Sequence, residues 1–407
     1  HLASKLFTPI TIGPLTLRNR TIRSAAFEGM CPGNAPSPML LDYHRSVAAG
    51  GVGMTTVAYA SVTRSGLSFP RQLWLRPEII PGLRELTDAI HAEGAAASIQ
   101  IGHCGNMSHK SICGVTPISA SSGFNIYSPT WVRGMRREEL PEMAKAYGRA
   151  VYLAREAGFD AVEVHAGHGY LISQFLSPYT NRRKDEYGGS LENRMRFMTI
   201  VMEEVMKAAG SDIAVFVKMN MRDGFRGGME IEETLEVARR LESLGVHALV
   251  LSGGFVSKAP MYVMRGAMPI RTLTHYMDCW WLKYGVKLAG RVMIPTVPFK
   301  EAYFLEDALK FRSEIKIPLI YVGGLVSREK IDEVLNEGFE AVQMARALLN
   351  EPGFVNRMRR EEKARCNCGH SNYCIGRMYT IEMACHHHLA EELPLCLQKE
   401  IEHLENK

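Results

Sequence analysis

Short apolar segments alternate with amphipathic helical segments along most of this chain, and this alternation limits the fold more than any other feature. The segments with strand character cover residues 21–27, 53–60, 96–102, 161–165, 213–220, 247–254, 318–324 and 341–347. Helical periodicity marks residues 76–94, 139–158, 189–210, 232–245 and 327–338. Eight strands that alternate with helices predict a (β/α)8 TIM barrel. A doubly wound sheet is the alternative, but it ordinarily uses fewer strands.

Two segments interrupt the alternation and one follows it. Residues 103–138 are rich in Ser and Gly, and residues 255–316 contain several Met and aromatic residues, so we expect both to form lids over the barrel mouth. We also expect stretch 255–285 to shape an apolar pocket for a bulky ring system. The chain becomes charged and rich in Cys and His near its end. We therefore predict a barrel domain over 1–360 and a C-terminal extension over 361–407.

Composition and charge argue against several functional classes. The 407 residues are 46% hydrophobic, which is enough to bury a large core. The net charge of +5 is small, and basic residues are mixed with acidic ones, so no nucleic-acid surface is expected. The sequence has no apolar run of membrane-spanning length and no signal-peptide layout. With nine cysteines, it predicts a cytoplasmic protein with reduced thiols or a metal site rather than disulfides.

Polar residues at the ends of the predicted strands indicate a binding site, because the active site of such a barrel lies where its strands end. Gly323, Gly324 and Arg346 end the last two strands and predict a phosphate cradle, with a tight turn as the alternative for the glycines. Gln100 suits the edge of a heterocycle, since an amide both donates and accepts. Lys218 lies on a buried strand and needs an anionic partner, either a reduced flavin or a carboxylate inside the barrel.

Three proton-carrying side chains follow the apolar run VEV at another strand end, namely His165, His168 and Tyr170. Zinc ligation is one alternative, but no third ligand of matching spacing follows. Neutral imidazoles can hydrogen-bond a carbonyl oxygen, and a phenol can deliver a proton. Core packing remains the alternative for any single histidine.

These residues lie within a longer stretch that carries a family resemblance. VEVHAGHGYLISQFLSPYTNRRKDEYGGSLENR (162–194) resembles the central signature of the Old Yellow Enzyme family of FMN-dependent ene-reductases, which includes NADH:flavin oxidoreductases and 2,4-dienoyl-CoA reductase-like proteins. Further similarities are LTLRNRTIRSAAFEG, QIGHCG, AREAGFDAVEVHAGHGY, IYVGGL and MARALLNEPGF. They cover about residues 5–360, which is nearly the whole predicted barrel.

The resemblance implies an FMN that NADH or NADPH reduces. The implied FMN contacts are Ala25, Ala26 and Ala58 beside the ring, Gln100 at the pyrimidine edge, Lys218 by N1/O2, and Gly323, Gly324 and Arg346 at the phosphate. The first strand departs from the family by reading SAAFE, and Ala345 replaces a glycine that is common before the phosphate-binding arginine.

The resemblance also implies the reaction. His165 and His168 would hold the carbonyl oxygen of an enone or dienoyl substrate, hydride would pass from flavin N5 to Cβ, and Tyr170 would protonate Cα. An FMN-dependent isomerase or an amine demethylase-like enzyme on the same barrel is the alternative. The sequence leaves open whether the protein forms a homo-oligomer and whether an external electron-donor protein supplies it.

Four cysteines near the C-terminus form a second candidate site. Cys366, Cys368, Cys374 and Cys385 follow the spacing C-x1-C-x5-C-x10-C. Larger relatives carry a [4Fe–4S] cluster on C-x2-C-x3-C-x11-C. Only the first and last cysteines of this chain, Cys366 and Cys385, are separated along the sequence as in those relatives. Alternatively, CGHSNYC resembles the pattern CxxCNxC, and Ser371 then stands where that pattern has a cysteine. We predict a [4Fe–4S] cluster on the four thiolates, with zinc or no metal as alternatives.

The larger relatives also append domains that bind a second flavin and NADPH. The 407 residues leave no room for such domains after the extension. The nicotinamide is therefore expected to bind over the FMN itself, unless an outside carrier feeds electrons to the cluster.

Overall fold

Eight parallel strands form a closed barrel in the computed structural model, which describes residues 3–126, 129–389 and 392–405. The strands in chain order are β3 (Thr21–Arg23), β4 (Met54–Ser61), β5 (Ala96–Gly102), β9 (Ala161–Ala166), β10 (Ala214–Asn220), β11 (Ala248–Ser252), β12 (Leu319–Val322) and β13 (Ala341–Met344). Each pairs with the next, and β13 pairs with β3 to close the ring. The predicted TIM barrel is confirmed.

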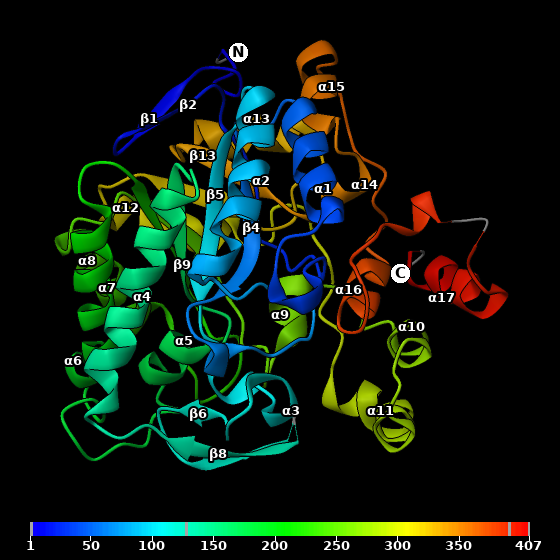
Figure 1. Ribbon diagram of the computed structural model, residues 1–407. Helices are drawn as coiled ribbons and strands as arrows, with labels where there is room; N and C mark the ends of the chain where they lie inside the picture. The colour runs from blue at the N-terminus through cyan, green and yellow to red at the C-terminus, as the bar shows by residue number, and fades with distance from the viewer. Residues whose placement is uncertain (1–2, 127–128, 390–391, 406–407) are drawn as a thin grey trace.

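Helices that follow the strands surround the barrel (Figure 1). They are α1 (Pro38–Ala49), α2 (Ile80–Ala92), α4 (Glu139–Glu156), α7 (Arg196–Ala209), α8 (Ile231–Ser243), α12 (Leu305–Glu314), α13 (Arg328–Asn336) and α15 (Phe354–Arg360). Their apolar faces form one large core with the outward-facing residues of the strands. Serine caps start two of them, since Ser37 and Ser327 accept hydrogen bonds from the backbones of Leu40 and Lys330.

A short hairpin closes the end of the barrel away from the predicted site. It consists of β1 (Ile10–Ile12) and β2 (Leu15–Leu17), which pair in antiparallel register. Its apolar residues pack against inward-facing residues of the strands, including Phe216 and Val250, in a separate interior cluster. Only the opposite end, where the strands finish, is therefore open to a ligand.

Several strands are shorter than the sequence predicted, because their C-terminal residues leave the ladder to build the site. The predicted strand 21–27 ends at Arg23, and the predicted strand 341–347 ends at Met344. Arg346 instead starts α14 (Arg346–Asn350).

The two predicted insertions have their own secondary structure. Within 103–138 lie η4 (Gly105–Met107), α3 (Lys110–Cys113) and a sheet of β6 (Ile118–Ser119), β7 (Gly123–Asn125) and β8 (Thr130–Gly134); positions 127–128 are outside the described residues. Within 255–316, before α12, lie α9 (Pro260–Met264), α10 (Ile270–His275) and α11 (Trp280–Met293). Trp280 and Trp281 are 78% and 57% exposed, so α11 presents its tryptophans to solvent and not to a pocket.

The C-terminal extension packs beside the second insertion. It contains α16 (Tyr373–Met378), the single turn η5 (His386–His388) and α17 (Leu395–Glu405). Helices α10, α11, α16 and α17 gather on one side of the barrel (Figure 1). Glu400 of α17 accepts hydrogen bonds from the backbone N–H groups of Arg271 and Thr272 at the start of α10. The extension is thereby fixed against the barrel.

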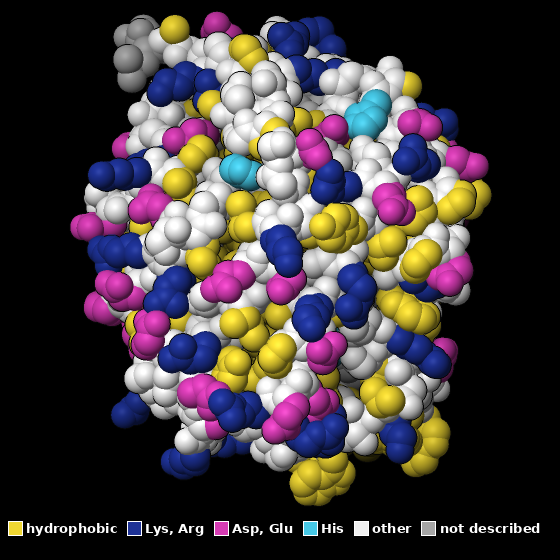
Figure 2. Space-filling view, turned by 60° about the vertical axis from the view of Figure 1, so that its left-hand side comes forward, with side chains coloured by type: hydrophobic (Ala, Val, Ile, Leu, Met, Phe, Trp, Pro, Cys, Tyr) yellow, Lys and Arg dark blue, Asp and Glu magenta, His cyan; other side chains and the backbone are white. Residues whose placement is uncertain are grey.

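The surface shows no large area of a single charge on the face drawn in Figure 2, where acidic and basic side chains are interspersed. Among the described residues, no helix combines the length and the apolar character that crossing a membrane requires.

Candidate active site

A cavity of about 1090 Å³, which includes space open to solvent, lies at the C-terminal ends of the barrel strands. The predicted site residues that line it are Ala25, Ala26, Gln100, His165, His168, Tyr170, Lys218 and Arg346. Ala58, Gly323 and Gly324 do not line it. The barrel thus brings together residues that are up to about 320 positions apart, because they lie at the ends of β3, β5, β9, β10 and β13 or in the segments that follow them.

A buried carboxylate organises the floor of the cavity. Glu163 lies on β9, and its two oxygens accept hydrogen bonds from Gln100 Nε2 at 2.7 Å and from Gln343 Nε2 at 2.9 Å. Lys218 Nζ lies 3.7 Å from Glu163 Oε2 and donates to Ser24 Oγ at 3.2 Å. Lys218 therefore has the anionic partner that its burial requires, and it still faces the cavity. Burial lowers the pKa of Lys218, and the charge of Glu163 opposes that shift.

The predicted phosphate cradle is covered by an aromatic side chain. Gly323 and Gly324 have positive φ angles of 134° and 72°, but the ring of Tyr303 lies where a side chain of Gly324 would stand. Tyr303 lines the cavity itself and donates a hydrogen bond to the carbonyl oxygen of Val263 at 2.6 Å. In this arrangement Arg346 is the one member of the predicted cradle that faces the cavity.

A second guanidinium lies behind Tyr303. Arg265 stacks on the Tyr303 ring with its Cζ 4.5 Å from the ring centroid, and its buried Nε has no hydrogen-bond partner. Arg346 bonds Asn372 Oδ1 at 2.7 Å. Two cations thus flank the same end of the cavity, which suits an anionic group.

The remaining implied flavin contacts divide into two cases. Ala25 and Ala26 line the cavity, as the resemblance implies. The backbone N–H of Ala58 instead donates to Glu28 Oε1 at 3.1 Å, so it is already used within the protein. Ala345 has φ −111°, a conformation open to any residue, which explains why alanine can replace glycine there.

His165 and His168 lie side by side with ring centroids 4.9 Å apart. His165 Nδ1 accepts the backbone N–H of Gly167 at 3.4 Å, and His168 Nε2 hydrogen-bonds Ser252 Oγ at 2.7 Å. These contacts leave Nε2 of His165 and Nδ1 of His168 for a ligand. Burial lowers the pKa of His168 to about 3 and that of His165 well below its usual value, so both imidazoles are neutral.

The backbone at His168 is held in a rarely used conformation. Its φ is +59°, and its N–H donates to Asn220 Oδ1 at 3.0 Å. Asn220 is buried and also donates to Asp223 and to the carbonyl oxygen of Gly254. Such conformations cost about 1–3 kcal/mol and persist where surrounding contacts fix them, commonly at functional sites.

Tyr170 completes the cluster together with a tyrosine that the sequence analysis missed. The Tyr170 ring lies 5.0 Å from His165 and stacks on Tyr59 at 5.3 Å. Tyr59 lines the cavity and is 5% exposed, and its buried hydroxyl has no hydrogen-bond partner. Burial raises the pKa of both phenols well above the usual value, so both stay protonated.

The missed residues carried only weak signals in the sequence. Glu163 is a charged residue within an apolar strand, two positions before His165 and so on the same face. Asn220 and Ser252 end two strands, which is the position where polar residues were sought. Tyr59 lies inside an apolar run and gave no signal that distinguishes it from core.

The extension forms one wall of the cavity. Cys374, Ile375, Met378 and Met383 line it opposite the barrel residues. Cys374 and Arg346 also line a neighbouring small pocket, whose remaining polar side chains include Cys368, Ser371 and Cys385. The two pockets therefore share a wall.

Three of the four predicted metal-ligating cysteines line this second pocket, which we call the cysteine pocket. Cys366 does not, and it packs into the main barrel core instead. Asn350 Nδ2 donates a hydrogen bond to the sulfur of Cys385 at 3.6 Å, and hydrogen bonds to sulfur are a feature that tunes iron–sulfur sites. Ser371 also lines this pocket. Of the four predicted ligands, Cys366 alone thus lies outside the lining of the cysteine pocket.

Mononuclear zinc fits the thiols poorly. Tetrahedral zinc with Zn–S bonds of about 2.3 Å places its sulfurs about 3.8 Å apart. Within the described residues, no group of three Sγ atoms has all members within 4.8 Å of one another.

Parallel barrels bind phosphate-bearing cofactors at this end, and the donors present suit both ends of FMN: an amide and an ammonium at the ring, two guanidinium groups at the phosphate. The fold and the cavity thus define a flavin-dependent oxidoreductase. Residues 5–289 match the model of the NADH:flavin oxidoreductase / NADH oxidase family, and the chain belongs to this family, that of Old Yellow Enzyme. It is an NAD(P)H-dependent flavin oxidoreductase.

Individual relatives support this assignment. The chain is 41% identical to a 4,4'-dithiodibutanoate disulfide reductase of Rhodococcus erythropolis over 92% of this chain and 93% of the relative. It is 31% identical to an NADPH dehydrogenase of Halalkalibacterium halodurans, over 86% of this chain and 92% of that protein. The structure of a 2-naphthoyl-CoA reductase superimposes with a TM-score of 0.79 at 24% identity, covering 98% of this chain and 58% of that one. At that identity the likeness concerns the fold alone.

Proposed function

We propose that the protein reduces the C=C bond of an α,β-unsaturated carbonyl compound. The observation that carries the proposal is the cluster of two neutral imidazoles and one protonated phenol on one side of the cavity. Each imidazole has a nitrogen turned away from its protein contacts. This set can bind a carbonyl oxygen and protonate a carbon beside it.

The roles of the side chains follow from their contacts. His165 and His168 donate to the carbonyl oxygen and stabilise the negative charge that develops on it. Ser252 and Asn220 hold His168 in place. Tyr170 delivers its proton to Cα, and its raised pKa keeps that proton available at neutral pH.

When bound, FMN supplies the hydride, and NADH or NADPH then reduces the flavin again. Gln100 and Lys218 would hold its pyrimidine edge, and Lys218 would stabilise negative charge there. Arg346 would hold its phosphate, and Arg265 lies close enough to assist. Binding of the phosphate at Gly323 and Gly324 requires the Tyr303 ring to move away from them.

Disulfide reduction is the second candidate, and the similarity to the Rhodococcus disulfide reductase over nearly the whole chain favours it. One hydride and one proton convert a disulfide into two thiols: the S–S bond breaks, one sulfur takes the hydride and the other takes the proton. Tyr170 can supply that proton. In this reaction the negative charge develops on sulfur and not on a carbonyl oxygen, so the imidazole pair has no developing oxyanion to stabilise and becomes the discriminating feature.

Anaerobic stopped-flow measurement tests both candidates. Dithionite-reduced enzyme is mixed with 2-cyclohexenone or with 4,4'-dithiodibutanoate, and flavin reoxidation is followed. We expect rapid reoxidation by the enone, and a loss with His168→Ala for the enone alone. Reoxidation by neither compound would contradict both candidates. Fast reoxidation by the disulfide alone, unaffected by His168→Ala, would favour the second.

We further propose that the cysteine pocket holds an iron–sulfur cluster on Cys368, Cys374 and Cys385, with Ser371 at the fourth corner. The three thiols, the hydrogen bond from Asn350 to the Cys385 sulfur and the nearby Arg346 support this. In anaerobically purified protein we expect iron and acid-labile sulfide, both lost in Cys368→Ser and both retained in Cys366→Ser. Equal loss in the two variants would contradict the revised ligand set.

A further inference from the structure

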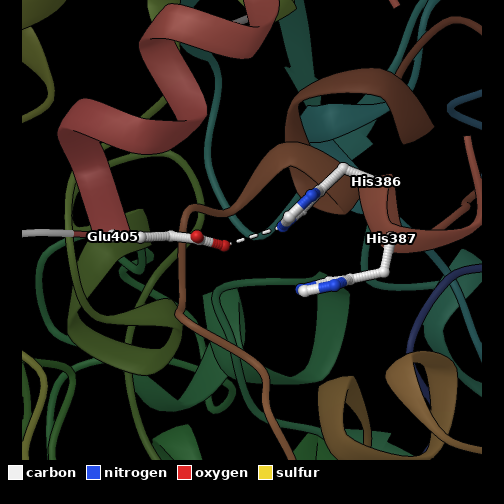
Figure 3. Close-up of side chains that lie close together, drawn as sticks. All are labelled: His386, His387 and Glu405. Atoms are coloured by element: carbon white, nitrogen blue, oxygen red, sulfur yellow. Dashed lines mark hydrogen bonds and ion pairs between the residues drawn. The ribbon is translucent and has the colours of Figure 1, made fainter. Parts of the chain in front are cut away.

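A histidine pair and a carboxylate converge beside the cysteine pocket. His386 and His387 lie on η5, and Glu405 lies at the end of α17, nearly twenty residues further along the chain. Their ligand atoms all lie within 4.8 Å of one another, and within the described part of the chain no other group of three His, Cys, Asp or Glu residues is this compact. Figure 3 shows both imidazoles and the carboxylate turned toward a common point.

A bound ion would take the place of the hydrogen bond that now joins two members of this group. His386 Nε2 lies 2.7 Å from Glu405 Oε1, and the two imidazole rings have centroids 4.2 Å apart. A tetrahedral zinc ion with bonds of about 2.0–2.1 Å places its ligand atoms about 3.3 Å apart. The His386–Glu405 pair needs to open by about 0.6 Å, with the ion replacing the proton that now joins the two groups.

The surroundings also favour an ion over a simple hydrogen bond. His387 is exposed and Glu405 is half-buried, so solvent can reach the fourth coordination position. His388, the next residue, turns away and hydrogen-bonds the carbonyl oxygen of Asn350 at 3.0 Å. Two of the three histidines in this run therefore point at the carboxylate, while the third has a structural contact.

We propose that His386, His387 and Glu405 bind a divalent transition-metal ion of the zinc type, separate from the thiols. Two imidazoles and one carboxylate with an open position are a usual ligand set for zinc. The ion would link α17 to η5, because Glu405 belongs to α17 and both histidines belong to η5. Glu405 also lies against Gly369, because a Cβ added to Gly369 would come within 2.6 Å of the Glu405 carboxyl carbon. The carboxylate that binds the ion therefore also covers the cysteine pocket.

Cobalt substitution tests this proposal on the full-length, untagged protein. The protein is treated with chelator and titrated anaerobically with Co²⁺ alone, and bound metal and visible absorption are measured. We expect about one equivalent of Co²⁺ with d–d bands of a nitrogen and oxygen site. We expect His387→Ala and Glu405→Gln to lose this equivalent, while the flavin and iron contents of His387→Ala, whose side chain does not line the cysteine pocket, stay unchanged.

His388→Ala is the matched control, because it removes a neighbouring imidazole that is not aimed at the site. It should bind cobalt as the unchanged protein does. His387→Ala removes an exposed side chain and leaves the fold intact, which circular dichroism checks. The proposal is overturned if His387→Ala binds the same equivalent, or if the cobalt spectrum is dominated by thiolate charge transfer that Cys368→Ser abolishes.

Discussion

Replacing Tyr170 by phenylalanine is expected to slow reoxidation of the reduced enzyme by an enone by about two to four orders of magnitude. General acid catalysis by a positioned side chain commonly contributes that much. The substitution removes only the hydroxyl and keeps the stacking on Tyr59 and the contact with His165. Stopped-flow measurement of the oxidative half-reaction, compared with reduction of the flavin by NADPH, provides the readout.

The reductive half-reaction serves as the internal control for this variant. Hydride transfer from NADPH needs no proton from Tyr170, so its rate should change little. Because burial raises the pKa of Tyr170, the phenol is protonated throughout the neutral range, and the rate with enone should be flat between about pH 6 and 9. An unchanged rate with enone in Tyr170→Phe would remove this residue from the proton-transfer role.

The second large effect is a loss of folding stability, which we expect from Glu163→Met. This substitution leaves the buried ammonium of Lys218 without its carboxylate partner. Removing one partner of a buried ion pair commonly costs about 3–5 kcal/mol. The substitution also strips an acceptor from Gln100 and from Gln343. Urea unfolding of the flavin-free protein should therefore show a free energy of unfolding lower by about that amount.

The double variant Glu163→Met/Lys218→Met is the matched control. It removes both charges and keeps the side-chain volumes similar, so much of the lost stability should return. A double variant as unstable as Glu163→Met would show that the uncompensated ammonium is not the cause, and would assign the loss to Gln100 and Gln343.

The barrel was predictable because its signal is local. Apolar segments of strand length and amphipathic helices appear directly in the residue order, and parallel strands joined by helices have few ways to pack. The strand ends were predictable too, which is why the sequence alone placed His165, Lys218 and Arg346 at one cavity. Strand lengths were overestimated, because apolar residues such as those after Arg23 continue into loops of the site.

Contacts between distant segments were not predictable in the same way. The partner of Lys218 was left open between a bound anion and a carboxylate, and only the ring of strands shows that Glu163 faces it. Stretch 255–285 was expected to shape an apolar pocket. Its residues Val256, Val263 and Met264 line the cavity, whereas its two tryptophans face solvent. Cys366 was grouped with three other cysteines by spacing, and its neighbours in space turned out to be barrel core.

Sequence alone thus determined the barrel, the end of it that binds ligand, and the chemistry of HAGHGY as two imidazoles and a phenol. Tertiary structure decided which groups lie together: Ser252 on His168, Tyr59 on Tyr170, Tyr303 over the glycine pair, and Ser371 but not Cys366 in the lining of the cysteine pocket. The reason is physical. Secondary structure follows from periodicity within a few residues, whereas each of these contacts joins segments whose separation along the chain contains no information about their distance in space.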